Sequence, residues 1–324
     1  MELPTVLRIK NIYYPILSAF GIPANLLTIL ILCRGNCGLS KCISVYMVAM
    51  AAADLMVMIV NIIVYQILSY HFPHSFLNYT AMCKLNLFLN PLTVDMSVWL
   101  TVCFTFDRFI AICCEKFKTK YCTVRTTATV IITESVLICS ENIPFCFAYE
   151  PERIINNVHW GCRYSVNFFI SPAGIAYSWF KSIFVTWVPF VLISLFNCLT
   201  VRRILLASRA RRGLRGHANE NQSDLEMEKR KKSIILLFSV SGSFILLWLT
   251  AAVSYLTSRL TNPVQYRGDY TAPAYIATET GLMLMYLSSC TNTCIYAATQ
   301  TKFREELKTV VKSPWTMILT LFKK

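Results

Sequence analysis

The sequence is short of charged side chains. Only 15% of its 324 residues are Asp, Glu, Lys or Arg, while 55% are hydrophobic. A soluble domain carries about 25% charged residues, so this composition indicates a chain whose surroundings are not only water. Its 10 glycines and 12 prolines are too few for a low-complexity chain. Internal repeats of the length that builds solenoids are also missing.

Motifs of catalysis and of nucleic-acid binding are absent as well. The sequence contains no nucleophile–base set, HExxH motif or phosphate-binding loop, so it gives no support for an enzyme or an enzyme cofactor. Basic residues are not interleaved with aromatic ones as in nucleic-acid-binding segments, and no nucleic-acid partner is expected. Most of the 14 cysteines fall in apolar stretches, where cysteine behaves as a small apolar side chain.

Seven apolar segments are present instead, each close to the ~20 residues that cross a bilayer as a helix. They cover approximately residues 12–33, 43–69, 85–106, 126–148, 174–201, 233–257 and 274–298. The first is too long for the apolar core of a signal peptide and is therefore expected to be a span. The prediction is an all-α seven-transmembrane bundle that forms a single domain over residues 1–324.

The basic residues are unevenly distributed between the two sides of such a bundle. With the N-terminus outside, most of the 31 lysines and arginines fall in inner loops and the C-terminal tail. This asymmetry predicts an outer N-terminus and an inner C-terminus. The net charge of +14 then fits an anionic inner leaflet and an acidic partner protein.

Two connections are long, the outer segment 149–173 and the inner segment 202–232. The inner one has basic ends, which are expected to extend the flanking helices, around a polar and flexible middle. After the last span, apolar residues recur at helical spacing among charges over residues 301–312. This pattern predicts a short amphipathic helix on the inner membrane surface, ended by Pro314.

Asp107 and Arg108 interrupt the third apolar segment in the stretch FTFDRFIAICC. Cys83 precedes Arg108 by 25 residues, about 37 Å along a helix, so the two residues belong to opposite rims of the membrane. Cys162 falls in the outer segment, and an oxidising exterior favours a Cys83–Cys162 disulfide. Two free thiols are the alternative.

With these landmarks the sequence resembles the rhodopsin-like (class A) G-protein-coupled receptors over nearly its whole length. The matching positions, in chain order, are Asn25, Asp54, Cys83, Asp107–Phe109, Pro189, Trp248 and Asn292–Tyr296. The resemblance implies a multi-pass receptor of the plasma membrane. Its implied partners are an extracellular small-molecule or peptide ligand, a heterotrimeric G protein and membrane lipid.

A narrower likeness is to the orphan G-protein-coupled receptor 139/142 group. It rests on the stretch SVWLTVCFTFDRFIAIC, on Asn197 eight residues after Pro189, on LRG at 214–216 and on a seventh-helix motif without its proline. Some members of that group respond to aromatic amino acids or small peptides. The likeness therefore implies a ligand of that kind.

The family resemblance also implies an allosteric sodium site in mid-membrane, where an ionisable side chain is a functional candidate by default. Its ligands would be Asp54, Ser97, Ser288 and Asn292, because carboxylate, hydroxyl and amide oxygens suit a small hard cation. The alternative is a protonated Asp54 that is hydrogen-bonded across the helices.

Activation is assigned by the resemblance to Arg108, which pairs with Asp107 at rest and turns towards the G protein as helix six moves outward. Phe109, Asn197, Asn292 and Tyr296 complete the implied set of activation residues. For a helix six without insertions, the count back from Trp248 places Arg230 at the position of a second acidic latch, so that latch is not expected and a higher basal activity would follow. A different register would bring Glu226 or Glu228 near. Thr250 and Thr293 replace two family prolines, so helices six and seven are expected to bend less.

The predicted ligand pocket consists of Asn90, Asp95, Lys181, Trp248, Tyr255, Glu279 and Tyr286. Asn90 stands where amine receptors carry an aspartate, so a monoamine ligand is not expected. Lys181 has two interpretations, a buried pair with Asp95 or an anchor for a ligand carboxylate. If Lys181 holds a ligand carboxylate and Glu279 holds a ligand amine, the pocket would fit an aromatic amino acid or a short peptide.

Two other functions are compatible with seven helices. The first is a non-signalling scavenger, chaperone or dimerisation partner. A homodimer is a further expected partner. A transporter or channel is the other and would use the intramembrane acids as an ion path, but an odd number of spans without repeats speaks against it.

Overall fold

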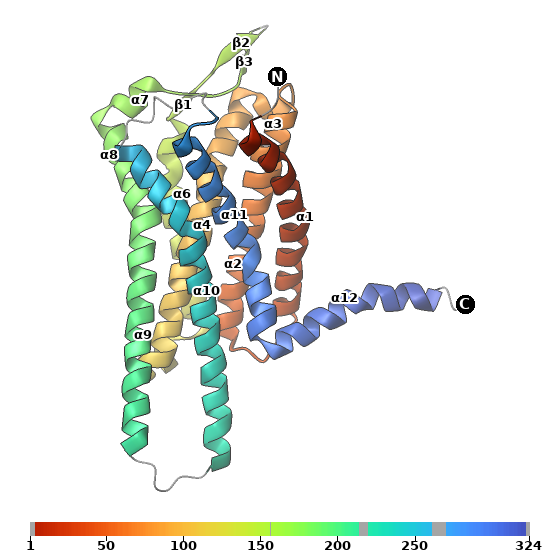
Figure 1. Cartoon of the computed structure of the whole chain (residues 1–324), viewed down its shortest axis with the longest axis vertical. Helices are drawn as coiled ribbons and strands as arrows, with labels where there is room; N and C mark the ends of the chain where they lie inside the picture. Colours follow the sequence, from red (N-terminus) through yellow and green to blue (C-terminus); the bar gives the residue numbers. More distant parts are fainter. Residues whose placement is uncertain (1–3, 156, 214–219, 261–269, 322–324) are drawn as a thin grey trace.

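The computed structural model describes residues 4–155, 157–213, 220–260 and 270–321. Long helices run side by side and form one bundle (Figure 1). Six helical segments within the described residues are long and apolar enough to cross a membrane. They are Thr5–Cys33, Lys41–His71, Thr80–Cys113, Val124–Cys146, Pro172–Ala207 and Lys231–Thr257. Each overlaps one of the first six predicted spans and extends beyond it at one or both ends.

The bundle is built from eight long or medium helices, two of which continue through π-helical turns. They are α1 (Thr5–Cys33), α2 (Lys41–Val57), α4 (Thr80–Cys113), α6 (Val124–Asn142), α8 (Pro172–Ser182), α9 (Val188–Gly213), α10 (Glu220–Leu260) and α11 (Pro273–Thr299). A π-helical segment, Met58–Leu68, prolongs α2 into α3 (Ser69–His71), and another, Ile183–Trp187, joins α8 to α9. Short helices α5 (Glu115–Tyr121) and α7 (Val166–Ile170) and 3-10 turns at Phe76–Asn78 and Ile143–Cys146 lie in the connections.

Helix α11 covers the seventh predicted span but is less apolar than the other six. Its second half contains the run Ser288, Ser289, Thr291, Asn292 and Thr293, most of which faces other helices. It packs closely against α10, because a Cβ at Gly281 would stand 2.8 Å from the Cα of Ala251. Only glycine allows the two backbones to approach so closely.

The described chain is predominantly helical, as predicted, but the outer segment 149–173 also contains four short strands, which were not predicted. They are β1 (Tyr149–Glu150), β2 (Arg153–Ile155), β3 (Val158–Trp160) and β4 (Arg163–Tyr164), paired antiparallel as β1–β4 and β2–β3. Asn157, with φ of 59°, lies in the turn between β2 and β3, a conformation that asparagine tolerates. Strands of two or three residues are too short to produce an alternating pattern in the sequence, which is why they were not predicted.

Helices α9 and α10 project beyond the rest of the bundle at the end opposite the strands (Figure 1). The basic ends of the segment 202–232 therefore extend the flanking helices, as predicted. Its middle, 214–219, lies outside the described residues. Helix α10 is one uninterrupted α-helix through position 230, so the count back from Trp248 is free of insertions. The side chain of Arg230 is outside the described part.

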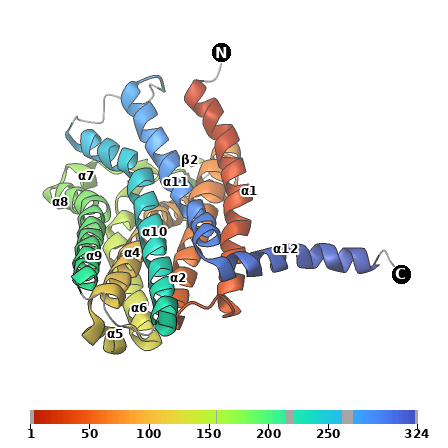
Figure 2. The ribbon, with the colours of Figure 1, turned by 60° about the horizontal axis from the view of Figure 1, so that its bottom comes forward.

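Helix α12 (Thr301–Leu321) follows α11 after a single residue and points sideways, away from the bundle, in both views (Figures 1 and 2). Phe303 is fully buried and packs edge-on against Tyr296, with ring centroids 6.0 Å apart. The helix is longer than the predicted 301–312, because it continues through Pro314 instead of ending there. Pro314 has no backbone N–H, so one intrahelical hydrogen bond is missing there.

Two clusters of buried apolar side chains fill the bundle, one in each half. Tyr14, Val98, Trp248 and Tyr286 belong to the half nearer the strands. Tyr46, Phe104, Tyr296 and Phe303 belong to the half nearer α12. Polar side chains lie within and between these clusters, and they form the candidate sites.

Candidate functional site

Asp54 lies fully buried between α2, α4 and α11. Its Oδ1 accepts a hydrogen bond from Ser97 Oγ (2.6 Å) and its Oδ2 accepts one from Asn292 Nδ2 (2.9 Å). Ser289 also lies against this carboxylate. Three of the four predicted sodium ligands are thus together.

Ser288, the fourth predicted sodium ligand, makes a different contact. Its Oγ accepts a hydrogen bond from the indole NH of Trp248 (3.0 Å) and donates to the Met285 carbonyl. One helical residue corresponds to a rotation of about 100°, so Ser289, and not Ser288, is directed at Asp54. In this structure Ser288 therefore contacts Trp248 and not Asp54.

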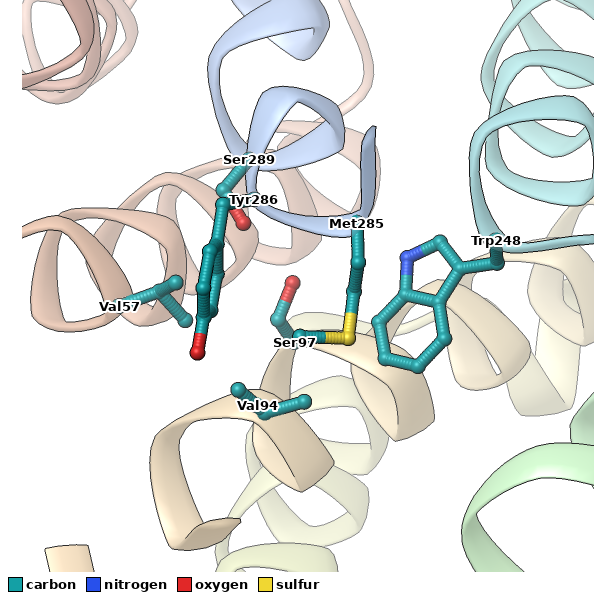
Figure 3. Close-up of a pocket in the computed structure, with 7 residues that line it drawn as sticks. All are labelled: Val57, Val94, Ser97, Trp248, Met285, Tyr286 and Ser289. Atoms are coloured by element: carbon teal, nitrogen blue, oxygen red, sulfur yellow. The ribbon is translucent and has the colours of Figure 1, made fainter. Parts of the chain in front are cut away.

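A narrow cavity, too small in this conformation for a water molecule, lies just outside the Asp54 group, between Trp248 and Tyr286 (Figure 3). Met285 and Ser97 lie between the two aromatic rings, Val57 lies beside Tyr286, and Val94 lies below Ser97. A second cavity, lined by Ser97, Thr101, Ser243, Phe244, Ser288 and Asn292 among others, lies next to it. Because Ser97 lines both, the Trp248 region and the Asp54 group share a wall.

Arg108 and Asp107 form an ion pair at the opposite end of the bundle from the strands. Both side chains are buried, with 4% and 0% of their areas exposed, and Arg108 Nε and Nη2 both donate to Asp107 Oδ2. The thiol of Cys122 lies next to the same carboxylate. Its pKa is raised to about 11, mainly by burial and in addition by the negative charge of Asp107. Burial and Asp107 also raise the pKa of Tyr121. The arginine is therefore enclosed in this structure.

The other predicted activation residues make separate contacts, and one of them, Asn292, belongs to the Asp54 group. Phe109 stacks on Phe196 of α9, with centroids 5.7 Å apart. Asn197 Nδ2 donates to Ser241 Oγ at 2.8 Å and thereby ties α9 to α10. Tyr296 is fully buried, and its hydroxyl has no hydrogen-bond partner within the described residues.

Lys181 is enclosed by acceptors from α4 and α6. Its Nζ donates to Asp95 Oδ2, to Glu141 Oε1 (2.8 Å) and to Asn142 Oδ1 (3.1 Å). Asn142 also donates to Asp95 Oδ2 at 2.9 Å. An ammonium has three N–H donors, and all three are used here. The Asp95–Lys181 pair set out as one interpretation is present, and no N–H remains for a ligand carboxylate in this conformation.

Glu141 and Asn142 were missed by the sequence analysis. A signal was available, since Glu141 is an acidic residue within the fourth predicted span, 126–148. Glu134 itself is buried, and neither of its carboxylate oxygens has a hydrogen-bond partner within the described residues. It does not join the hydrogen bonds around Lys181.

Glu279 lies near the start of α11 and pairs with Lys10 of α1, with 2.7 Å between Oε2 and Nζ. The side chains retain only 12% and 14% exposure. Lys10 was not among the predicted residues, because it precedes the first predicted span. The Asn90 amide nitrogen is buried without a partner in the described part, and Tyr255 packs against the cluster that contains Trp248 and Tyr286.

The disulfide between Cys83 and Cys162 is present, with 6.1 Å between the Cα atoms. It ties the start of α4 to the segment that carries the strands, as predicted. Thr80 Oγ1 also donates to the Gly161 carbonyl (2.9 Å), so the same junction is held twice.

Two comparisons with known proteins bear on this site. A family model described as 7 transmembrane receptor (rhodopsin family) matches residues 24–296. The Allatostatin-A receptor of Bombyx mori is 24% identical over 314 residues, which cover 95% of this chain and 81% of the relative. The matched region contains the Asp54 group, the Asp107–Arg108 pair and the disulfide.

Proposed function

Since the chain belongs to the rhodopsin family of seven-transmembrane receptors, we propose that it is activated by an extracellular peptide or aromatic amino acid and signals by an outward movement of α10. Membership makes it a multi-pass membrane protein that signals through G proteins, not an enzyme. The peptide part of the proposal is supported by the likeness to an Allatostatin-A receptor.

The buried Asp107–Arg108 pair is the observation that carries the mechanism. Its arginine is 4% exposed and lies in the last two turns of α4. An arginine in such a position must leave the carboxylate before it can reach a partner protein. We therefore propose that the structure is the resting state, in which Asp107 holds Arg108 inside the bundle.

Movement of α10 requires that its contacts with neighbouring helices change. The Asn197–Ser241 hydrogen bond would break, and the close contact at Gly281 and Ala251 would serve as the pivot. No kinking proline lies in α10, so we propose that it moves as a straight rod.

We also propose the orientation with the strands outside. The Cys83–Cys162 disulfide lies at that end, and disulfides form in oxidising compartments. The opposite end carries the basic extensions of α9 and α10, in agreement with an inner location. Helix α11 is then the seventh span and α12 an amphipathic helix against the inner lipid surface.

A sodium ion is proposed as an allosteric ligand of the Asp54 group. The donor set fits, because a buried carboxylate is accompanied by the hydroxyls of Ser97 and Ser289 and the amide of Asn292. The ion would neutralise the buried carboxylate and hold α2, α4 and α11 together.

The ligand is proposed to enter between the strands and the Trp248 cavity. In the resting state, Lys181 is saturated by Asp95, Glu141 and Asn142, which favours a structural role in joining α4, α6 and α8. Glu279 lies nearer the outer end and is the remaining acid predicted to meet a ligand. A ligand like those of the orphan G-protein-coupled receptor 139/142 group remains part of this proposal.

The test is a cell assay of G-protein activation with a panel of allatostatin-A peptides, other short peptides and aromatic amino acids. We expect at least one to activate the wild type and none to activate Arg108→Ala at equal surface expression. The proposal would be contradicted if G-protein activation by wild type and by the variant stayed at the same background level for every ligand and every G-protein class. Such a result would favour the non-signalling scavenger or dimer partner.

A further inference from the structure

The surroundings of Glu279 combine a buried carboxylate with several tyrosines. Glu279 is buried and lies on the inward face of α11. Tyr14, Tyr65, Tyr275 and Tyr286 all lie close enough to interact electrostatically with it. These tyrosines come from α1, from the π-helical end of α2 and from α11.

This combination is the chemistry that recognises an ammonium or guanidinium group. The face of an aromatic ring attracts a cation, and a carboxylate supplies the opposite charge. In this structure the chain fills the site itself. Lys10 Nζ lies 2.7 Å from Glu279 Oε2 and 5.9 Å from the centroid of the Tyr14 ring.

The site lies where an extracellular molecule can reach it in the proposed orientation. Helix α1 has 29 residues, about 43 Å, whereas the hydrocarbon core is about 30 Å thick. Lys10 is 23 residues from the inner end of α1, about 34 Å, and so stands at the outer edge of the membrane. A lysine there has water within reach once it leaves Glu279.

The site is also connected to the cavity beside Trp248. Tyr14 packs edge-on against Tyr286, with centroids 6.1 Å apart. Tyr286 lines that cavity and donates from its hydroxyl to Asn61 Oδ1 at 3.4 Å. Two successive contacts, Lys10 with Tyr14 and Tyr14 with Tyr286, thus link Lys10 to a wall of the Trp248 cavity.

We propose that Glu279 and its tyrosines bind a cationic group of the agonist, an amine or a guanidinium, and that Lys10 is a built-in occupant which the agonist displaces. The inference rests on the proposed receptor function and specifies the ligand class. Lys10 then competes with the agonist for Glu279, so removal of the Lys10 charge should strengthen the binding of cationic ligands. If the pair is closed nine-tenths of the time, the gain is about tenfold, because apparent affinity scales with the fraction of open sites.

The experiment uses purified full-length receptor and two matched probes. L-tyrosine amide carries an ammonium group, and N-acetyl-L-tyrosine amide is its neutral counterpart. The concentration of each probe that gives half of the maximal thermal stabilisation is measured for wild type, Lys10→Met and Glu279→Gln. Lys84→Met, at the outer end of α4, is the control for loss of a positive charge at the same end of the bundle.

We expect the cationic probe to act at about tenfold lower concentration on Lys10→Met than on wild type, and Lys84→Met to match wild type. Glu279→Gln should no longer distinguish the two probes. Equal concentrations for Lys10→Met and wild type overturn the inference, as does a cation preference that survives Glu279→Gln. Absence of stabilisation by either probe in both wild type and Lys10→Met also overturns it. Should Lys10→Met fail to fold, Lys10→Gln replaces it.

The outcome is separable from that of the proposed function. An agonist found in the cell panel that activates wild type, Lys10→Met and Glu279→Gln equally, but not Arg108→Ala, leaves the receptor function in place and removes the Lys10 site. Loss of signalling in every variant and in wild type contradicts the receptor mechanism whatever the probes show.

Discussion

Asn197 of α9 donates a 2.8 Å hydrogen bond to Ser241 of α10, and Ser241 in turn donates to the Leu237 carbonyl of its own helix. The bond joins the two helices that project furthest from the bundle. In the proposed mechanism these helices separate on activation, so the bond belongs to the resting state only.

Ser241→Ala is therefore expected to raise basal G-protein activation. Loss of one hydrogen bond from the resting state is worth about 1 kcal/mol, or about fivefold in the resting-to-active ratio. The measurement is ligand-free signalling at matched surface expression. Ser140→Ala, whose hydroxyl bonds only to the Val136 carbonyl of its own helix, is the control. A basal level equal to that of wild type would show that this bond does not restrain α10.

Lys181→Met is expected to destabilise the receptor by about 3–5 kcal/mol, because it leaves Asp95 and Glu141 buried without their cation. The thermal midpoint of the purified protein and its surface expression are the measurements. The triple variant with Asp95→Asn and Glu141→Gln should recover most of the loss, since the buried charges go with the lysine. A Lys181→Met protein as stable as wild type, but with weakened ligand binding, would return Lys181 to the ligand pocket.

Asp54→Asn tests the sodium site. Wild-type receptor should melt at a higher temperature in sodium chloride than in choline chloride of equal ionic strength, and Asp54→Asn should melt equally in both. The carboxylate provides the charge that binds the ion, whereas the amide of the variant keeps only the hydrogen-bonding shape. Equal melting of the wild type in the two salts would support the alternative of a protonated, hydrogen-bonded Asp54.

Gly281→Ala tests the contact between α10 and α11. The added methyl would meet the backbone of Ala251 at 2.8 Å, so we expect a loss of about 1–3 kcal/mol in stability. Gly242→Ala is the matched control, because a Cβ at Gly242 meets nothing within 4 Å. That variant should be neutral or slightly more stable, since alanine restricts the unfolded chain. Equal effects of the two substitutions would contradict a close contact at Gly281.

Several features could be predicted from the sequence because they depend on local patterns. Apolar length alone located the six segments that can cross a membrane. Landmark residues that follow one another on these segments, among them Asp54, Arg108 and Trp248, indicated the receptor family. The disulfide followed from two cysteines at the same rim, one on the third helix and one in the outer segment. These inferences need only the helical rise and the membrane thickness.

Partners between helices were harder to predict, because a sequence does not state the rotation of one helix against another. Ser288 and Ser289 are adjacent, and only packing decides that Ser288 meets Trp248 while Ser289 meets Asp54. The short strands of the outer segment were missed for a related reason. Their register depends on residues brought together by the disulfide and not on a repeating pattern.

The sequence by itself determined that this chain is a helical membrane receptor, because hydrophobic length and a few spaced landmarks are properties of each segment alone. Only the tertiary structure decided which charges are neutralised. It places Lys181 among Asp95, Glu141 and Asn142, and Lys10 on Glu279. A buried charge is stable only beside its partner, and that partner lies on another helix, at a distance along the chain that no local pattern reveals.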